Sequence, residues 1–170
     1  LKVQEGVFQV LATNGDTHLG GDDIDRLLVE QVAKDLGLDP ATQADAVQAV
    51  RKAVIQAKWD LSEFDETRID IAGVPGRAEP YRRRITRAEF GSLIAPIVAR
   101  TLEPCRRALE DAGLSASQVD EAVLVGGSTR IPMVRREVAA LFGRAPHTDL
   151  NPDEVVAIGA AVQADILVSG

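Results

Sequence analysis

The sequence is poor in the residues that build covalent and metal-centred sites. It has one cysteine, Cys105, and two histidines, His18 and His147, in 170 residues. A single cysteine excludes an internal disulfide and a cysteine-based metal cluster, and two histidines so far apart form no zinc-binding pattern. Because Cys105 falls at an apolar position of an expected helix, we interpret it as a small core residue and not as a nucleophile.

Aromatic residues, positive charge and long apolar runs are scarce as well. Aromatic residues make up 4% of the chain, so aliphatic side chains must build its core. The net charge of −7 argues against a nucleic-acid partner, because phosphate backbones are bound by basic surfaces. No apolar run approaches the roughly 18 residues that cross a membrane, and the chain opens without Met or a signal-peptide pattern. We expect a cytoplasmic piece of a longer protein, with no membrane partner.

The patterning that is present predicts two kinds of region. Residues 1–19 and 100–170 alternate strand and helix patterns, which is typical of an α/β subdomain. Residues 20–99 are mainly helical with a small antiparallel sheet, and we interpret them as an α+β subdomain inserted into the first. A chain of this length can bury on the order of 70% of its unfolded surface.

Helical spacing and end signals locate the expected elements. Gly37, Gly113 and Gly143 are expected to end helices, and Pro132 to begin one. Strands are expected at 1–13, 67–73, 81–85 and 122–125, and helices at 22–36, 41–62, 86–112, 132–142 and from 151 onward. Pro96 and Pro104 are expected to bend or interrupt the longest helix. The last helix is rich in small apolar residues, which predicts close packing against a sheet.

Acidic residues gather where the first of these helices begins. Asp22, Asp23 and Asp25 follow Gly20-Gly21. The cluster raises the question of a metal site, but the helix dipole alone explains acids in a first turn, and we favour that interpretation. We expect Asp22 or Asp23 to cap the helix.

The most informative stretch runs from Val123 to Pro132, VLVGGSTRIP. An apolar run of strand length breaks at Gly126-Gly127, passes through a polar turn and starts a helix. Glycines let a ligand approach the backbone, and helix-start N–H groups favour a polar or anionic ligand. Arg130 adds a planar cation that can stack on a ring or pair with an anion. A tight structural turn explains the spacing equally well.

Four stretches together resemble the seventy-kilodalton heat-shock chaperone family. They are LATNGDTHLGGDDID at 11–25, CRRALEDAGL at 105–114, VLVGGSTRIPMV at 123–134 and NPDEVVAIGAAVQADIL at 151–167. The resemblance spans the chain, although it is weak across 38–85. Within the family it is closest to the HscA branch, which serves iron–sulfur cluster assembly. Residues 67–85, 90–114 and 161–167 carry that closer similarity.

The resemblance implies a fold and a position within it. The family's ATPase domain has an actin-like (ribonuclease H-like) fold of two lobes, with nucleotide held between them. This chain corresponds to the second lobe, with 1–19 and 100–170 as its IIA-like subdomain and 20–99 as its IIB-like insertion. The catalytic lysine and the phosphate-binding hairpins fall outside it. The resemblance therefore implies an ATPase in the intact protein but no catalytic residue in this chain.

The resemblance also assigns binding residues and partners. ATP or ADP, with Mg²⁺ in the intact domain, is the implied cofactor. Gly126, Gly127, Ser128 and Arg130 should line the adenosine site with Arg130 stacked on adenine, Lys58 and Ser62 should close its other side, and Asp153 should lie near the base. The implied partners are a J-domain co-chaperone, a client protein, an iron–sulfur scaffold protein and an exchange factor that grips 20–99.

Two positions depart from the family pattern. Family members usually carry an acid where this chain has Ile55, one turn before Lys58, and an arginine or aliphatic residue where it has Trp59. Two other functions are kept open, and Ile55 bears on the second of them. One is a lobe of an actin-fold sugar or acetate kinase, and the other is an interaction module that does not bind nucleotide.

Overall fold

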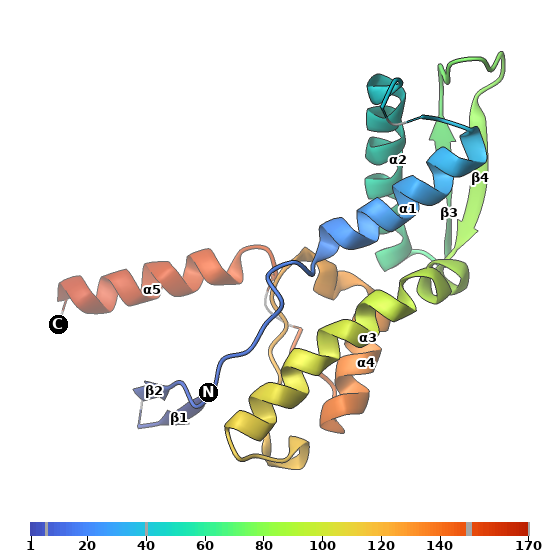
Figure 1. The fold of residues 1–170 in the computed structure, drawn as a ribbon. Helices are drawn as coiled ribbons and strands as arrows, with labels where there is room; N and C mark the ends of the chain where they lie inside the picture. The colour runs from blue at the N-terminus through green and yellow to red at the C-terminus, as the bar shows by residue number, and fades with distance from the viewer. Residues whose placement is uncertain (6, 40, 149–150, 170) are drawn as a thin grey trace. The chain divides into compact units, whose positions relative to one another are not determined.

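The structure, a computed structural model, describes residues 1–5, 7–39, 41–148 and 151–169 (Figure 1). Its contacts divide the chain into two compact units. Unit 1 consists of Leu1–Thr17 and Val98–Gly170, and unit 2 of His18–Ile97. Unit 2 is therefore one uninterrupted stretch of sequence placed between the two segments of unit 1.

Unit 2 is built from two helices, a hairpin and the start of a third helix. Helices α1 (Gly21–Leu36) and α2 (Ala44–Glu63) pack together, and α2 also packs on strand β3 (Glu66–Ile71). β3 pairs antiparallel with β4 (Tyr81–Thr86) over its full length, with Ile69 opposite Arg83. Figure 1 shows α2 running beside this hairpin. The two strands confirm the antiparallel sheet expected from the sequence.

Apolar stripes at helical spacing form the core of unit 2. The buried positions on α1 and α2 follow the expected faces, and the hairpin adds side chains from alternate positions. The largest fully buried side chains of this unit are those of Leu28, Val32, Val50, Val54, Leu61, Ile69, Ile85, Phe90 and Ile94. The aliphatic core predicted from the low aromatic content is therefore confirmed in this unit.

The ends of α1 are set by glycines. Gly37 ends the helix in the left-handed conformation, with φ of 65°, as expected. At the start, Gly20 is the N-cap, and its N–H donates to Asp23 Oδ2 at 2.8 Å. The expectation that Asp22 or Asp23 caps the helix is wrong, because Asp23 is the third helical residue and reaches back to the N-cap as the acidic half of a capping box.

Helix α3 (Arg87–Asp111) is one continuous helix, so Pro96 and Pro104 do not interrupt it, whereas the bend expected there stays a prediction. Each proline removes one bond to the carbonyl four residues before it, at Ser92 and Arg100. Both of these residues are exposed, so water can satisfy the freed carbonyls. The buried face, at spacings of four residues, consists of Phe90, Ile94, Val98 and Leu102.

Unit 1 contains shorter and more exposed elements. A hairpin pairs β1 (Lys2–Gln4) with β2 (Val7–Gln9), and its strand residues are all exposed. After α3 come the 3₁₀ turns η1 (Ala116–Gln118) and η2 (Gly127–Arg130) and the helices α4 (Pro132–Phe142) and α5 (Val155–Ser169). Pro132 begins α4 and Gly143 ends it with φ of 68°, both as expected.

The strand expected at 122–125 is reduced to one parallel bridge, between Val123 and His147. Val123 and Val125 are 51% and 46% exposed, so this apolar run is not a buried strand. A single bridge provides too few backbone hydrogen bonds to stabilise a longer strand. Parallel strands are also normally covered on both faces by neighbouring elements, and among the described residues this segment is not. In the described residues, both sheets are two-stranded and antiparallel, and unit 1 contains no α/β sheet.

Helix α5, like residues 122–125, is more exposed than the sequence predicts. Every side chain from Val156 to Val168 is exposed, although the sequence predicts a helix lying against a sheet. Apart from Gln163, Asp165 and Ser169, the helix consists of apolar and small residues with no single apolar face, which is typical of an element covered on several sides. Within the part of the chain that the structure describes, no helix is long and apolar enough to cross a membrane.

Candidate functional site

The glycine turn in unit 1 is fixed by backbone hydrogen bonds. Gly126 precedes η2 with φ of 93°, a conformation that glycine adopts without strain. Its carbonyl accepts bonds from the Thr129 N–H at 3.0 Å and the Thr129 hydroxyl at 2.6 Å. Its N–H donates to the Pro152 carbonyl at 2.9 Å. The last bond joins the turn to the segment that leads into α5.

Arg130 lies at the end of this turn and is held along one edge. Its Nε and Nη2 atoms donate to Asp153 Oδ2 at 3.2 and 2.7 Å, and Nη2 also donates to Asn151 Oδ1 at 3.0 Å. Asn151 Oδ1 in turn accepts the Asp153 N–H at 3.1 Å, which orders the start of α5. Because these bonds lie in the guanidinium plane, they leave its faces able to stack on a flat ring.

Gly127 is placed where a larger residue would crowd this cluster. A Cβ built at this position would lie 3.2 Å from Asp153 Oδ1. The absence of a side chain therefore lets Asp153 approach the turn and reach Arg130. The structure thus brings together Gly126, Gly127, Arg130 and Asp153 from the predicted set.

Asn151 stands where the sequence predicts the last helix to begin, but the structure begins that helix later. Its side chain bonds the Asp153 N–H, and its carbonyl accepts from Glu154 and Val155, but the helix itself begins at Val155. The residues from Pro152 to Glu154 form a turn ahead of α5. Asn151 therefore orders the approach to the helix and at the same time holds Arg130.

The other predicted site residues, Lys58 and Ser62, belong to unit 2. They lie one turn apart on α2, and the Ser62 hydroxyl donates to the Lys58 carbonyl at 3.2 Å. Both are half-buried. Ile55 is half-buried one turn earlier, and Trp59 is 60% exposed beside Lys58. The role of these residues in nucleotide binding stays a prediction.

Sequence reasoning missed the partner of Lys58. Its Nζ lies 2.6 Å from Asp25 Oδ1 on α1, and the two side chains are only 14% and 7% exposed. Asp25 is the one buried charged residue in the described chain. A signal for this pair was available, since Asp25 falls next to Ile24 and one turn before Leu28, and Lys58 falls one turn after Val54 and one before Leu61. Each charge therefore interrupts the apolar stripe of its helix.

A second polar cluster in unit 2 joins α1, β4 and α3. Arg83 pairs with Asp35 at 2.8 Å and with Glu89 at 2.6 Å, and the Tyr81 hydroxyl donates to Asp35 at 3.1 Å. Burial, together with the bond to Asp35, raises the pKa of Tyr81. The bond to Glu89 raises the pKa of Arg83. This cluster bridges elements of the core and gives Arg83 a structural role.

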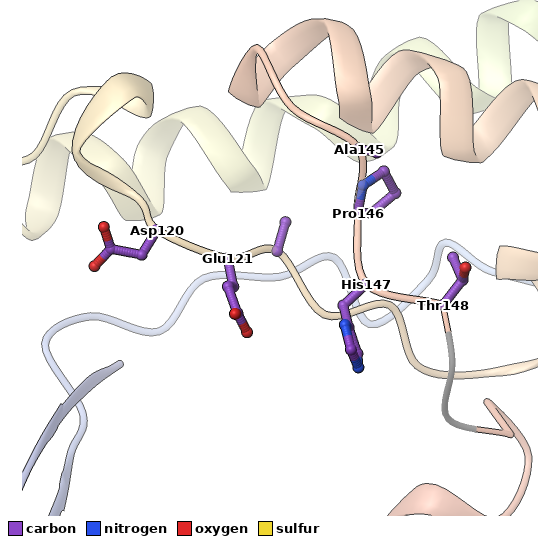
Figure 2. Close-up of a pocket in the computed structure, with 7 residues that line it drawn as sticks. Asp120, Glu121, Ala145, Pro146, His147 and Thr148 are labelled. Atoms are coloured by element: carbon purple, nitrogen blue, oxygen red, sulfur yellow. The ribbon is translucent and has the colours of Figure 1, made fainter.

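A shallow pocket of about 230 Å³ lies elsewhere in unit 1, between the segments that form the single bridge. It is lined by Asp120, Glu121, Ala122, Ala145, Pro146, His147 and Thr148. In Figure 2, Glu121 and His147 project in the same direction from the two segments. None of the predicted site residues lines this pocket. Among the described residues, no group of three or more His, Cys, Asp and Glu is placed to hold a metal ion.

The single thiol is placed as a packing group. Cys105 lies on α3 and its thiol donates to the Thr101 carbonyl at 3.6 Å. Burial raises the pKa of the Cys105 thiol, which lowers the fraction of reactive thiolate at neutral pH. The side chain is half-buried, so it lies at the edge of the apolar face of α3 and not at its centre.

Comparisons with known proteins agree over the length of the chain. The family model described as Hsp70 protein matches residues 1–170. The chain is 51% identical over 168 residues to "Chaperone protein HscA" of Pectobacterium atrosepticum and of Serratia proteamaculans, and 49% identical to that of Escherichia fergusonii. Each alignment covers 99% of this chain and 26% of the relative, so the chain spans about a quarter of their length. These matches confirm the resemblance carried by the four sequence stretches: the chain belongs to the Hsp70 family.

Proposed function

We propose that this chain forms the second lobe of an Hsp70 nucleotide-binding domain and contributes one half of an ATP/ADP site. Unit 1 would be the IIA-like subdomain and unit 2 the inserted IIB-like subdomain. The family membership supports an actin-like ATPase fold, and the similarity to chaperone proteins named HscA favours a role in protein folding or iron–sulfur cluster assembly. In the full-length protein, which would work in the cytoplasm, ATP binding and hydrolysis would drive changes in a peptide-binding domain.

The observation that carries this proposal is the edge-held guanidinium of Arg130. A cation bonded in its plane to Asp153 and Asn151 presents a face of fixed orientation, which suits stacking on adenine. The glycine turn fits the same ligand, because Gly126 and Gly127 leave the backbone open beside the guanidinium. Ser128, on η2 between Gly127 and Arg130, would line the same side of the adenosine.

We assign Lys58 and Ser62, which belong to unit 2, to the ribose and base. The nucleotide would bring Mg²⁺ with its phosphates, and no residue of this chain is assigned to that ion. The bound nucleotide supplies the phosphoanhydride that is hydrolysed, and the residues named here bind and orient its adenosine. The partners we propose for the full-length protein are a J-domain co-chaperone, a client, an iron–sulfur scaffold protein and an exchange factor that grips unit 2.

The proposal is tested by measuring ADP and ATP affinity of the full-length protein and its Arg130→Lys variant by titration calorimetry. A lysine cannot stack as a plane, so both affinities should fall by similar factors, about 2- to 30-fold. Arg136→Lys is the matched control, since Arg136 is exposed on α4 and, among the described residues, pairs with its neighbour Glu137. It should leave both affinities unchanged.

Two results would contradict the proposal in different ways. A loss confined to ATP would mean that Arg130 reads the γ-phosphate and not the base. No binding of either nucleotide by the wild-type protein would favour the interaction module. Trp59, the single tryptophan of the chain, is exposed beside Lys58 and gives a second readout through its fluorescence.

A further inference from the structure

The ion pair between Asp25 and Lys58 determines what kind of chemical group Lys58 can recognise. Lysine side chains are flexible point charges, and an exposed lysine near a nucleotide site would attract phosphate over several ångströms. Lys58 is neither flexible nor isolated, because Asp25 Oδ1 lies 2.6 Å from its Nζ and both side chains are largely buried. The pair therefore requires an account beyond that of a surface salt bridge.

Asp25 and Lys58 each need the opposite charge of the other, because both lie on apolar, buried helix faces. Asp25 lies between Ile24 and Leu28 on the buried face of α1, and Lys58 lies between the buried Val54 and Leu61 on α2. No described group makes an aligned hydrogen bond to Asp25 Oδ1, so the Lys58 cation compensates that charge alone. A buried charge left without its partner is strongly destabilising. The Lys58 ammonium group is consequently held beside Asp25 and does not move through the full reach of the lysine side chain.

Neutralisation changes what the fixed ammonium group can bind. As a unit the pair has no net charge, so it exerts little long-range attraction on a phosphate. The ammonium group still carries three N–H donors, and the contact with Asp25 does not occupy all of them. Ser62 complements it: its hydroxyl hydrogen is directed to the Lys58 carbonyl, which leaves the oxygen lone pairs to accept.

We propose that Asp25 is a positioning residue that fixes and neutralises Lys58, so that the Lys58–Ser62 side of the site recognises uncharged donor and acceptor groups of a nucleoside and not its phosphates. Lys58 donates to a hydroxyl or ring acceptor, and Ser62 accepts from a hydroxyl or amino group. This inference rests on the proposed function, because it describes how that same site selects its ligand.

The decisive experiment compares adenosine and ADP binding to the full-length wild-type protein and the double variant Asp25→Asn/Lys58→Met, by titration calorimetry. The double variant replaces a neutral pair by two uncharged side chains, so it leaves no buried charge unpaired. We expect it to weaken adenosine and ADP by the same factor, about tenfold for one lost hydrogen bond from a charged donor. A larger loss for ADP than for adenosine would overturn the proposal, because Lys58 would then be reading phosphate.

The single variant Asp25→Asn sharpens the test. It leaves the Lys58 charge uncompensated, so the ratio of ADP to adenosine affinity should rise about fivefold at low salt and return toward the wild-type value at high salt. Asp22→Asn is the matched control, because Asp22 is exposed on the same helix, 3.9 Å from Arg51, and should leave the ratio unchanged. A folded Asp25→Asn protein with an unchanged ratio would reduce Asp25 to a structural residue and overturn the proposal. If this variant does not fold, the double variant decides alone.

Failure of the proposed function itself has a different signature. A wild-type protein that binds neither adenosine nor ADP would overturn both proposals. A wild-type protein that binds both ligands, but whose double variant loses ADP selectively, would overturn only the role of Asp25.

Discussion

The two units of this chain bury their apolar residues to very different extents. In the described residues, the buried hydrophobic positions belong to unit 2 apart from Val98, Leu102, Ile131 and Val138. The exposed large hydrophobic residues belong to unit 1 apart from Trp59 and Phe64. Unit 1 also contains strongly apolar elements, such as α5, so apolar sequence alone does not determine whether a face is covered. Unit 2 contains both sides of its own core, whereas α5 and the β1–β2 hairpin of unit 1 have no described element packed over them.

The largest expected effect compares two leucines on helices, one in each unit. Leu61 on α2 is 0% exposed and Leu167 on α5 is 75% exposed. Leu61→Ala should lower the free energy of unfolding by about 2–5 kcal/mol, because it leaves a cavity in a packed core. Leu167→Ala should change it by less than about 0.5 kcal/mol. Urea denaturation of the 170-residue chain measures both, and equal losses would contradict the contrast between the units.

A second prediction concerns Ile55, which lies one turn before Lys58 among the unit 2 residues of the proposed nucleotide site and replaces the acid that the resemblance implies there. In the full-length protein, Ile55→Glu should slow ADP release about five- to hundredfold, if the carboxylate adds a charged hydrogen bond to the nucleoside. Stopped-flow release of a fluorescent ADP analogue measures it. Gln48→Glu, an exposed position on the same helix, controls for added negative charge. Unchanged release in Ile55→Glu would mean that Ile55 only packs within unit 2.

Sequence patterning was sufficient where a feature depends on local chemistry. The caps at Gly37 and Gly143, the start of α4 at Pro132 and the strands of the β3–β4 hairpin follow from residues within a few positions of each other. The strand at 122–125 was not predictable in this way, because its burial depends on neighbouring strands that its own residues cannot specify. The continuous α3 depended on whether the carbonyls freed by Pro96 and Pro104 face solvent, which is also a tertiary property.

The candidate site likewise combines features that local sequence reveals with features that depend on tertiary packing. The glycine turn and Arg130 could be found from the motif. The resemblance assigned Arg130 and Asp153 to one site, but the hydrogen bond between them was not predicted. The Asp25–Lys58 pair needed the packing of α1 on α2. In the sequence, the pair is marked only by a charged residue within each apolar stripe, Asp25 on α1 and Lys58 on α2.

A third prediction tests whether the same substitution, Gly→Ala at a helix C-cap, lowers the free energy of unfolding equally in the two units. Gly37 ends α1 in unit 2 and Gly143 ends α4 in unit 1, with φ of 65° and 68° and open space around both. Each Gly→Ala change should cost about 1–2 kcal/mol, because alanine is strained in the left-handed conformation. Thermal unfolding followed by circular dichroism measures the loss. Gly15→Ala is the control, since Gly15 is likewise unobstructed and has no positive φ. A cost at Gly37 alone would show that α4 frays independently of unit 1.

The smallest effect is expected at Cys105 in unit 1. Because burial raises the pKa of this thiol, alkylation by iodoacetamide at pH 8 should be slower in the folded chain than in the chain unfolded by urea. The same shift means that the stability contributed by the neutral thiol is present below the unfolded pKa and is lost as pH rises through the folded pKa. Equal alkylation rates in the two states would show that this face of α3 is open.

The order in which the units occur along the chain also has a consequence for synthesis on the ribosome. Unit 2 is complete once Ile97 has emerged, whereas unit 1 needs segments from both ends of the chain. Domains made of one continuous stretch can fold while translation continues. We therefore expect unit 2 to fold first, and its formation to bring the chain segment before His18 nearer to the one after Ile97 before the second half of unit 1 has been made. Folded unit 2 would then act as a short connection between the two segments of unit 1, which lowers the entropy cost of bringing those segments together.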